Sequence, residues 1–308
     1  MTNDTKAIEQ RRAKRREVFD KLKETFFLPS PSGTVMEVVR LCSSEDASLS
    51  EIADRIQTDP SLSSEIIKYA NSAFLSTGIQ VASVQKATVK LGMKSVVTLA
   101  IGFSLLAGHR SGNCDNFNYQ LFWKKSLAKA IAARELTKLN KDFDPEELFI
   151  CGLLCHMGSL SLATIFPEEY SKLLEDCPDN TPYSETESKQ FGIDSSELTS
   201  ELFIEWGLPV VFALSAGFHK DIGYVELGTG KTLRAAVYLS LADNIAQMCQ
   251  SIDPQLELLE ATLSMSDEYN IELGVFSETF QTIVDNWHDL GSLFEIATSQ
   301  CYSYNNEE

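Results

Sequence analysis

The chain has 308 residues, enough to bury a sizeable hydrophobic core without a disulfide or a structural metal. Its apolar runs fall short of the roughly 20 residues that a helix needs to cross a bilayer, so we expect no membrane span. The first residues are polar and basic, without the apolar segment of a secretory signal, which favours a cytoplasmic protein.

The net charge of −18 is unevenly distributed along the chain. Residues 1–139 carry 20 basic and 14 acidic side chains, whereas residues 140–308 carry 6 basic and 30 acidic ones. This acidic excess argues against non-specific binding of nucleic acid by the whole molecule. Nucleic acid is therefore an unlikely partner, although a local basic face in the first half stays open.

The periodicity of apolar residues predicts an all-α fold. Residues 1–24 form a basic helix or tail, and residues 25–110 form an N-terminal helical lobe. Within this lobe, Asp59 is the expected N-cap of a helix that has Pro60 at its first position. The helices expected in the lobe are Leu49 to Ile56, Ser61 to Ala73, Ser83 to Gly92 and Lys94 to Leu106.

A polar stretch from Gly108 to Asn118 separates this lobe from a helical bundle over residues 119–250. An extension over residues 253–303 follows, with two or three helices separated near Ser266 and Gly274. The acidic residues 305–308 are expected to fray. The helices expected in the bundle are Tyr119 to Leu139, Pro145 to Phe166, Ser195 to Trp206, Pro209 to Phe218 and Thr232 to Gln250.

The cysteines are odd in number and lack the spacing of a disulfide framework, which indicates reduced core thiols. Cys151 and Cys155 share a helix face, and with His156 they could hold a soft metal. A structural metal site needs further ligands close by, and no CxxC spacing supplies them. We therefore expect no metal and no cofactor. The seven cysteines are Cys42, Cys114, Cys151, Cys155, Cys177, Cys249 and Cys301.

A series of short motifs, spread from about Phe27 to Asp221, resembles the HDOD domain, the HD-related output domain of bacterial signalling proteins. This resemblance implies an all-α fold in which an N-terminal helical lobe packs on a degenerate HD-type bundle, with extra C-terminal helices here. The motifs are Leu28-Pro29, Asp59-Pro60-Ser61-Leu62, Ala70-Asn71-Ser72-Ala73, Leu91-Gly92, Phe122-Trp123, Gly152-Leu153-Leu154, Glu187 with Gly192, and Trp206-Gly207-Leu208-Pro209.

The resemblance also implies where the metal ligands of an active HD phosphohydrolase would fall. Only His219 and Asp243 keep a ligand type, and an imidazole cannot replace a metal-bridging aspartate without changing the charge and geometry of the site. Lys125 could instead pair with Asp243 and replace the metal by an internal ion pair. The degenerate HD-site positions are Lys125, Cys155, His156, Ser195, His219, Lys220 and Asp243.

These substitutions predict a non-catalytic signalling module, a pseudo-phosphohydrolase that acts through contacts with partner proteins. Homo-oligomer formation stays open. One alternative is a residual metal-dependent phosphohydrolase or phosphodiesterase built from His156, His219, Asp243 and Cys155. A third hypothesis is a nucleotide sensor that binds its ligand at the degenerate HD site without hydrolysing it.

Lys86, Lys90 and Lys94 would lie on one helical face if the helix that starts at Ser83 continued through Gly92. We consider this stripe, with Lys124 and Lys129, as a candidate surface for an acidic partner or an anionic ligand. Most charge runs are solvated faces, and that alternative stays open.

Two segments resemble a DNA-binding motif and a nucleotide-binding motif, but each lacks features that its motif requires. The pair of helices over Leu49 to Ala73 looks like a helix-turn-helix, but the second helix carries only Lys68 as a base, too few for DNA contact. The segment Gly228 to Thr232 ends like a phosphate-binding loop, but it lacks the first glycine and a preceding strand.

Overall fold

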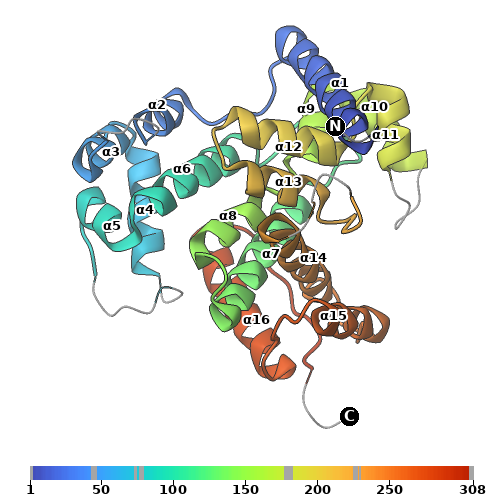
Figure 1. The fold of residues 1–308 in the computed structure, drawn as a ribbon. Helices are drawn as coiled ribbons and strands as arrows, with labels where there is room; N and C mark the ends of the chain where they lie inside the picture. The colour runs from blue at the N-terminus through green and yellow to red at the C-terminus, as the bar shows by residue number, and fades with distance from the viewer. Residues whose placement is uncertain are drawn as a thin grey trace. The chain divides into compact units, whose positions relative to one another are not determined.

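The computed structural model describes residues 3–42, 47–72, 75, 80–176, 183–224, 228 and 230–304. These residues form α-helices and no β-strand, which confirms the predicted all-α fold (Figure 1). The helices are α1 (Asn3–Thr25), α2 (Gly33–Cys42), α3 (Leu49–Ile56), α4 (Pro60–Asn71), α5 (Val84–Leu91), α6 (Met93–Gly108), α7 (Tyr119–Asn140), α8 (Pro145–Leu154), α9 (Met157–Ile165), α10 (Pro167–Asp176), α11 (Ser184–Phe191), α12 (Ser195–Glu205), α13 (Val210–Phe218), α14 (Lys231–Met248), α15 (Leu256–Glu268) and α16 (Phe276–Leu293).

The chain folds as two compact units, each assembled from three segments of sequence. Unit 1 contains Met1–Pro29, Ser111–Tyr119 and Leu154–Ser240. Unit 2 contains Ser30–Arg110, Gln120–Leu153 and Leu241–Glu308. The four-part division drawn from the sequence stays a prediction.

In unit 2, α2 to α6 contact one another and form the helical lobe that the sequence predicts (Figure 1). At the start of α3, the Ser48 hydroxyl accepts a hydrogen bond from the Glu51 amide. At the start of α4, the Asp59 carboxylate accepts a 3.0 Å hydrogen bond from the Leu62 amide. Such caps satisfy amides that a helix terminus leaves unpaired, and each contributes about 1 kcal/mol. The predicted helix starts in this lobe therefore rest on local hydrogen bonds.

A buried polar contact ties α4, α7 and α8 together in the same unit. The Tyr69 hydroxyl donates a hydrogen bond to the Glu146 carboxylate, and the Arg134 guanidinium donates to the other oxygen of that carboxylate at 2.6 Å. The Tyr69 ring is fully buried and lies within aromatic contact distance of Phe103 and Phe149. The polar and aromatic contacts together hold the lobe helix α4 against the rest of unit 2.

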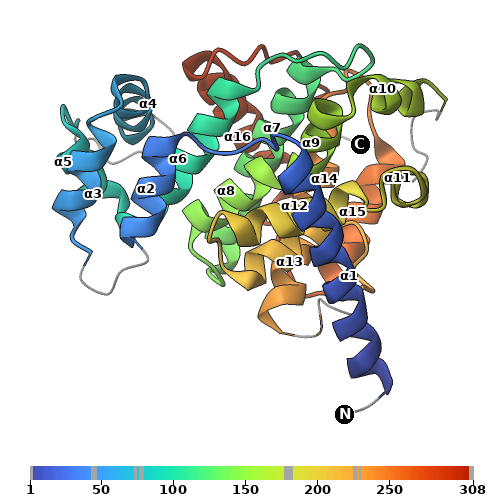
Figure 2. The same cartoon turned by 90° about the horizontal axis from the view of Figure 1, so that it is seen from above.

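In unit 1, α12 is the central helix, and α1, α9, α11 and α13 all contact it (Figure 2). From residue 3 onward the basic N-terminal segment is a helix, α1, rather than a tail, and an ion pair attaches it to α12. The Arg15 side chain donates to the Glu201 carboxylate at 2.7 Å, and the two side chains are only 3% and 4% exposed. The Arg15 guanidinium also lies over the Phe218 ring, 5.5 Å from its centroid.

The prediction of a single helix over Pro145 to Phe166 is wrong, because a turn interrupts the helix between α8 and α9. Cys155 and His156 occupy the break, and His156 has the non-helical dihedrals φ −109° and ψ 14°. By length and mean hydropathy the stretch Pro145–Ile165 would suffice to cross a membrane, but 78% of its most apolar window is buried inside the protein. We attribute this apolar character to the core of a folded protein.

Other differences from the predicted elements are small. Helices α2, α10 and α11 were not predicted from the periodicity, and α15 continues past Ser266 to Glu268 before the confirmed break near Gly274. The six described cysteines are free thiols, as the odd count indicates, whereas Cys177 lies outside the described residues. The acidic residues 305–308 also lie outside them.

Candidate functional site

The degenerate HD-site positions are divided between the two units. Lys125 and Asp243 belong to unit 2, and the other five positions, from Cys155 to Lys220, belong to unit 1. Lys125 and Lys220 have exposed side chains.

In unit 2, Asp243 on α14 forms its ion pair with Lys129, and not with Lys125 as the sequence suggested. The Lys129 ammonium lies 3.1 Å from the Asp243 carboxylate. The Lys129 side chain is 1% exposed, whereas Asp243 is 33% exposed. Lys125 lies one turn earlier on α7 and faces solvent, so the suggested pairing of Lys125 with Asp243 is wrong.

In unit 1, Cys155, His156 and His219 converge on one point. The Cys155 sulfur and one ring nitrogen from each histidine all lie within 4.8 Å of one another. The two imidazole rings have centroids 5.4 Å apart and planes at 69°. Cys155 and His219 are 3% and 2% exposed, and His156 is half-buried. The three side chains carry the donor atoms that soft transition metals prefer.

A hydrogen bond determines which ring nitrogen of His219 carries the proton. Its Nδ1 lies 2.8 Å from the backbone carbonyl oxygen of Ala216. A carbonyl oxygen only accepts hydrogen bonds, so Nδ1 carries the proton, and in the neutral ring the lone pair is on Nε2. Metal-ligating histidines are commonly oriented by this kind of hydrogen bond from the second ring nitrogen.

Two glycines explain how α9 and α13 bring these histidines together against α12. A Cβ atom on Gly158 would lie 1.8 Å from the carbonyl oxygen of Ser195, and one on Gly217 would lie 2.8 Å from that of Ser196. The Gly158 amide also donates to the Thr199 hydroxyl at 2.9 Å. His156 precedes Gly158 by two residues and His219 follows Gly217 by two, so close packing at the glycines sets where both rings lie.

Ser195, the position of another HD histidine, serves as the first residue of α12. Its amide donates to the buried Glu187 carboxylate at 2.8 Å, and the Tyr170 hydroxyl donates to the other oxygen of that carboxylate at 3.0 Å. Gly192, with φ +79°, ends α11 in a conformation that other residues rarely adopt. The motif that pairs Glu187 with Gly192 therefore has a structural role at the start of α12.

Burial raises the pKa of Glu187 above its ordinary value of 4.5, and the hydrogen bonds from Ser195 and Tyr170 oppose that rise only in part. Since the folded-state pKa is the higher one, folding favours the neutral carboxyl group. The contribution of Glu187 to stability is fully present below the unfolded-state pKa and is lost as the pH rises through the folded-state pKa.

We expect Glu187→Gln, which is neutral at every pH, to remove this loss. Its free energy of unfolding will fall less steeply than that of the parent chain as the pH rises from about 4.5. Urea denaturation at a series of pH values measures the slope. Glu185→Gln is the matched control, because Glu185 is 85% exposed, and it should keep the parent slope. Equal slopes for all three proteins would contradict the assignment.

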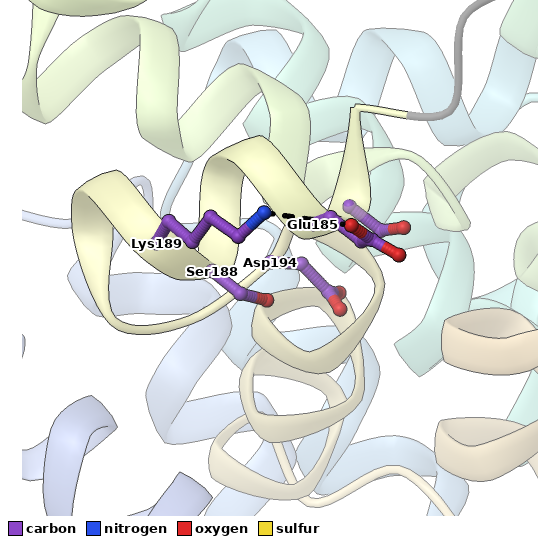
Figure 3. A pocket seen from close by; sticks show the side chains of 5 residues that line it. Glu185, Ser188, Lys189 and Asp194 are labelled. Atoms are coloured by element: carbon purple, nitrogen blue, oxygen red, sulfur yellow. Dashed lines mark ion pairs between the residues drawn. The ribbon is translucent and has the colours of Figure 1, made fainter.

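A surface hollow of about 360 Å³ lies beside α11 and the start of α12, lined by Ser184, Glu185, Ser188, Lys189 and Asp194 (Figure 3). Lys189 and Glu185 form a 3.5 Å ion pair there, and both are more than three-quarters exposed. Exposed pairs of this kind contribute little, and the hollow is bordered by none of the degenerate HD-site positions. We regard it as ordinary solvated surface.

The predicted lysine stripe is interrupted. Gly92, with φ +84°, separates α5 from α6, so Lys94 lies in a different helix from Lys86 and Lys90. Lys86 is exposed, whereas the Lys90 ammonium donates to the backbone carbonyl of Ala70. Lys129 is buried, so it is not part of the candidate surface. Val89, 71% exposed, lies beside Lys86 and Lys90 on α5.

Some residues that shape the site were not identified from the sequence. Lys129 was considered only as part of the lysine stripe, although it is the one charge in the apolar run from Leu127 to Ala133, which is a signal of burial. For Gly158 and Gly217 the signal was weaker, because a glycine inside a helical pattern has several explanations. Their contacts with α12 join residues distant in sequence.

The described helices define a class of all-helical protein built from two compact units. Residues 28–222 match the HDOD domain family, and the chain belongs to it.

Solved structures of similar proteins agree with this assignment. A response regulator, MmoQ from Methylococcus capsulatus, is 34% identical, with 84% of this chain and 98% of that chain covered and a TM-score of 0.51. A candidate phosphohydrolase from Shewanella amazonensis is 22% identical, with 92% and 98% covered and a TM-score of 0.72, a likeness of fold.

An uncharacterized protein of Treponema pallidum is 25% identical over 197 residues, which is 63% of this chain. The matched region spans 38% of the length of that protein.

The superfamily implies a divalent metal pair held by histidine and aspartate, and the described residues do not fit it. The cluster in unit 1 has a thiol and two imidazoles and contains no carboxylate. The aspartate in unit 2 is paired with a buried ammonium group. Oxygen-preferring metals such as Mg²⁺ and Mn²⁺ favour carboxylate ligands. We therefore derive no step through such a pair.

Proposed function

We propose that this HDOD protein is a non-catalytic module of bacterial signal transduction, located in the cytoplasm, that acts through contacts with partner proteins. The observation that carries the proposal is the Lys129–Asp243 ion pair. Asp243 stands where an HD enzyme has its closing metal-ligating aspartate. An ammonium 3.1 Å from that carboxylate offsets its charge and repels a cation from it.

The burial of Lys129 makes the neutralisation of the Asp243 charge a fixed part of the folded structure. A lysine that is 1% exposed does not leave the carboxylate for solvent without opening unit 2. A metal that displaced Lys129 would leave the ammonium buried without its counter-ion, which costs several kcal/mol. Loss of the hydrolytic site is therefore supported by charge as well as by ligand identity.

A regulatory role is supported by the MmoQ response regulator, to which this chain is 34% identical over most of its length. A candidate partner surface is the outer face of α5, where Lys86 and the 71% exposed Val89 lie one turn apart. An apolar side chain beside an exposed ammonium group suits a partner that presents an acidic, partly apolar surface.

The test compares turnover and partner binding in the same preparations. The purified chain, supplied with Mg²⁺, Mn²⁺ or Fe²⁺, should hydrolyse nucleotides and phosphodiesters no faster than buffer. Hydrolysis that disappears in Asp243→Asn would overturn the proposal. Hydrolysis that persists in that variant but disappears on repurification reports a contaminating enzyme, whereas hydrolysis that stays with the repurified chain would also overturn the proposal.

Partner binding is measured by cross-linking in the native cell followed by mass spectrometry. Lys86→Glu should reduce cross-linking to the partner by about tenfold or more, equivalent to 1.4 kcal/mol, because it places a like charge against an acidic surface. Lys189→Glu on α11 is the matched control and should bind as the parent chain does. Identical cross-links from all three proteins would exclude this surface, and the absence of any partner would contradict the function.

A further inference from the structure

We propose that Cys155, His156 and His219 form a binding site for one soft transition-metal ion, for which Zn²⁺ is the natural probe. The proposal goes beyond the signalling function and does not depend on it. Two combinations were considered from the sequence. The proposed site has His219 in place of Cys151 of the first, and it lacks Asp243 of the second, which belongs to unit 2.

The ligand atoms already lie close to the separations that a metal requires. Zinc binds sulfur at about 2.3 Å and imidazole nitrogen at about 2.0–2.1 Å, so two ligands of one tetrahedral zinc lie roughly 3.3–3.6 Å apart. The three ligand atoms here lie within 4.8 Å of one another. Contraction by about 1 Å, through side-chain rotation, would complete the coordination.

The orientation of the rings agrees with the same geometry. Two imidazoles bound to one tetrahedral zinc through their nitrogens place their centroids about 5.2 Å apart. The His156 and His219 centroids are 5.4 Å apart, with the planes inclined at 69°. An ordinary edge-to-face contact between aromatic rings has a similar separation, so the experiment must distinguish the two.

The surroundings of the cluster favour metal binding over simple packing. The Nδ1 hydrogen bond of His219 to Ala216 is 2.8 Å long and leaves the lone pair on Nε2. Close packing of Gly158 and Gly217 on α12 holds the two backbone segments, so little entropy remains to be lost when an ion binds.

The ligand set selects the class of metal. A thiolate and two imidazoles suit Zn²⁺ and other soft or borderline ions, whereas Mg²⁺, Ca²⁺ and Mn²⁺ prefer oxygen ligands. Three protein ligands leave a fourth position for water or for a group from outside the cluster. Bound metal would join the break between α8 and α9 to the end of α13, and would therefore stabilise unit 1.

Cobalt titration of the full-length chain, stripped of metal with a chelator, tests the site directly. We expect one Co²⁺ per chain, a sulfur-to-cobalt charge-transfer band, and loss of that band on addition of Zn²⁺. Cys155→Ser should abolish the band, and His219→Gln should weaken Zn²⁺ binding by more than about 100-fold. Cys151→Ala and His288→Gln, outside the cluster, are the matched controls and should bind as the parent chain does.

Several outcomes would overturn the site. One is the absence of the charge-transfer band in the parent chain, a result that does not depend on whether any variant folds. Another is Zn²⁺ affinity unchanged by both Cys155→Ser and His219→Gln, with circular dichroism showing that they fold. A third is loss of the band in Cys151→Ala, which would favour the sequence-based combination.

The result is separable from the proposed function. Zinc binding without hydrolysis leaves both proposals standing. Zinc-dependent hydrolysis lost in Cys155→Ser would overturn the non-catalytic function and retain the metal site. The absence of zinc binding would remove the site alone.

Discussion

Replacing Gly158 with alanine will destabilise the protein by about 3 kcal/mol or more. The added methyl group would lie 1.8 Å from the carbonyl oxygen of Ser195 and 2.7 Å from its carbon. These are backbone atoms of α12, so no side-chain rotation relieves the clash, and α9 and α12 must separate. Separation also breaks the hydrogen bond from the Gly158 amide to the Thr199 hydroxyl. Urea denaturation followed by circular dichroism measures the loss.

Gly108→Ala is the matched control, because a Cβ atom there meets no atom within 4 Å. It should change the free energy of unfolding by less than about 1 kcal/mol, and in the stabilising direction if it changes at all. The loss of stability caused by Gly217→Ala should lie between those caused by Gly158→Ala and Gly108→Ala. Its Cβ atom would lie 2.8 Å from the Ser196 carbonyl oxygen, whereas that of Gly158→Ala would lie 1.8 Å from the Ser195 carbonyl oxygen. Equal stability of Gly158→Ala and the parent chain would contradict the close packing of α9 on α12.

Glu201→Leu should cost about 3–5 kcal/mol, because it leaves the Arg15 guanidinium buried without its carboxylate. The two side chains are 3% and 4% exposed and 2.7 Å apart. Helix α1 can relieve the penalty by leaving α12, which exposes Arg15 to water. We therefore expect limited proteolysis to cleave α1 faster in this variant, in addition to the lower free energy of unfolding.

Two further variants separate charge burial from packing. The double substitution Arg15→Met with Glu201→Leu should recover most of the lost stability, since apolar pairs of similar volume commonly replace buried ion pairs at little cost. Lys189→Ala, which removes the exposed pair with Glu185, should change stability by less than about 1 kcal/mol. If Glu201→Leu were no more costly than Lys189→Ala, the Arg15 pair would not anchor α1.

The elements best predicted from sequence are those with local signals. Helix α3 matches its predicted bounds, Leu49–Ile56, and α4 begins at Pro60 after the Asp59 cap. The motifs from Phe27 to Asp221 identify the family, which matches residues 28–222. Capping and apolar periodicity depend on residues within a turn or two of one another, so no knowledge of the tertiary fold is needed.

The site was predicted less completely, and the reason is geometric. Lys125 and Lys129 share one face of α7, and the sequence offers no means to decide which one reaches Asp243, more than a hundred residues later. The break in the helix at Cys155 and His156 was also missed, because both flanking stretches are apolar and helix-forming. The position of a break within such a run depends on what the two halves pack against.

The sequence by itself determined the helical class and the family, because these depend on residue identity and local spacing. Only the tertiary structure decided that Lys129 pairs with Asp243 and that His219 joins Cys155 and His156. The physical reason is that such contacts require helices distant in sequence to approach within a few ångströms. That approach depends on how surfaces pack, as at Gly158 and Gly217 against α12, and packing is a property of the folded chain.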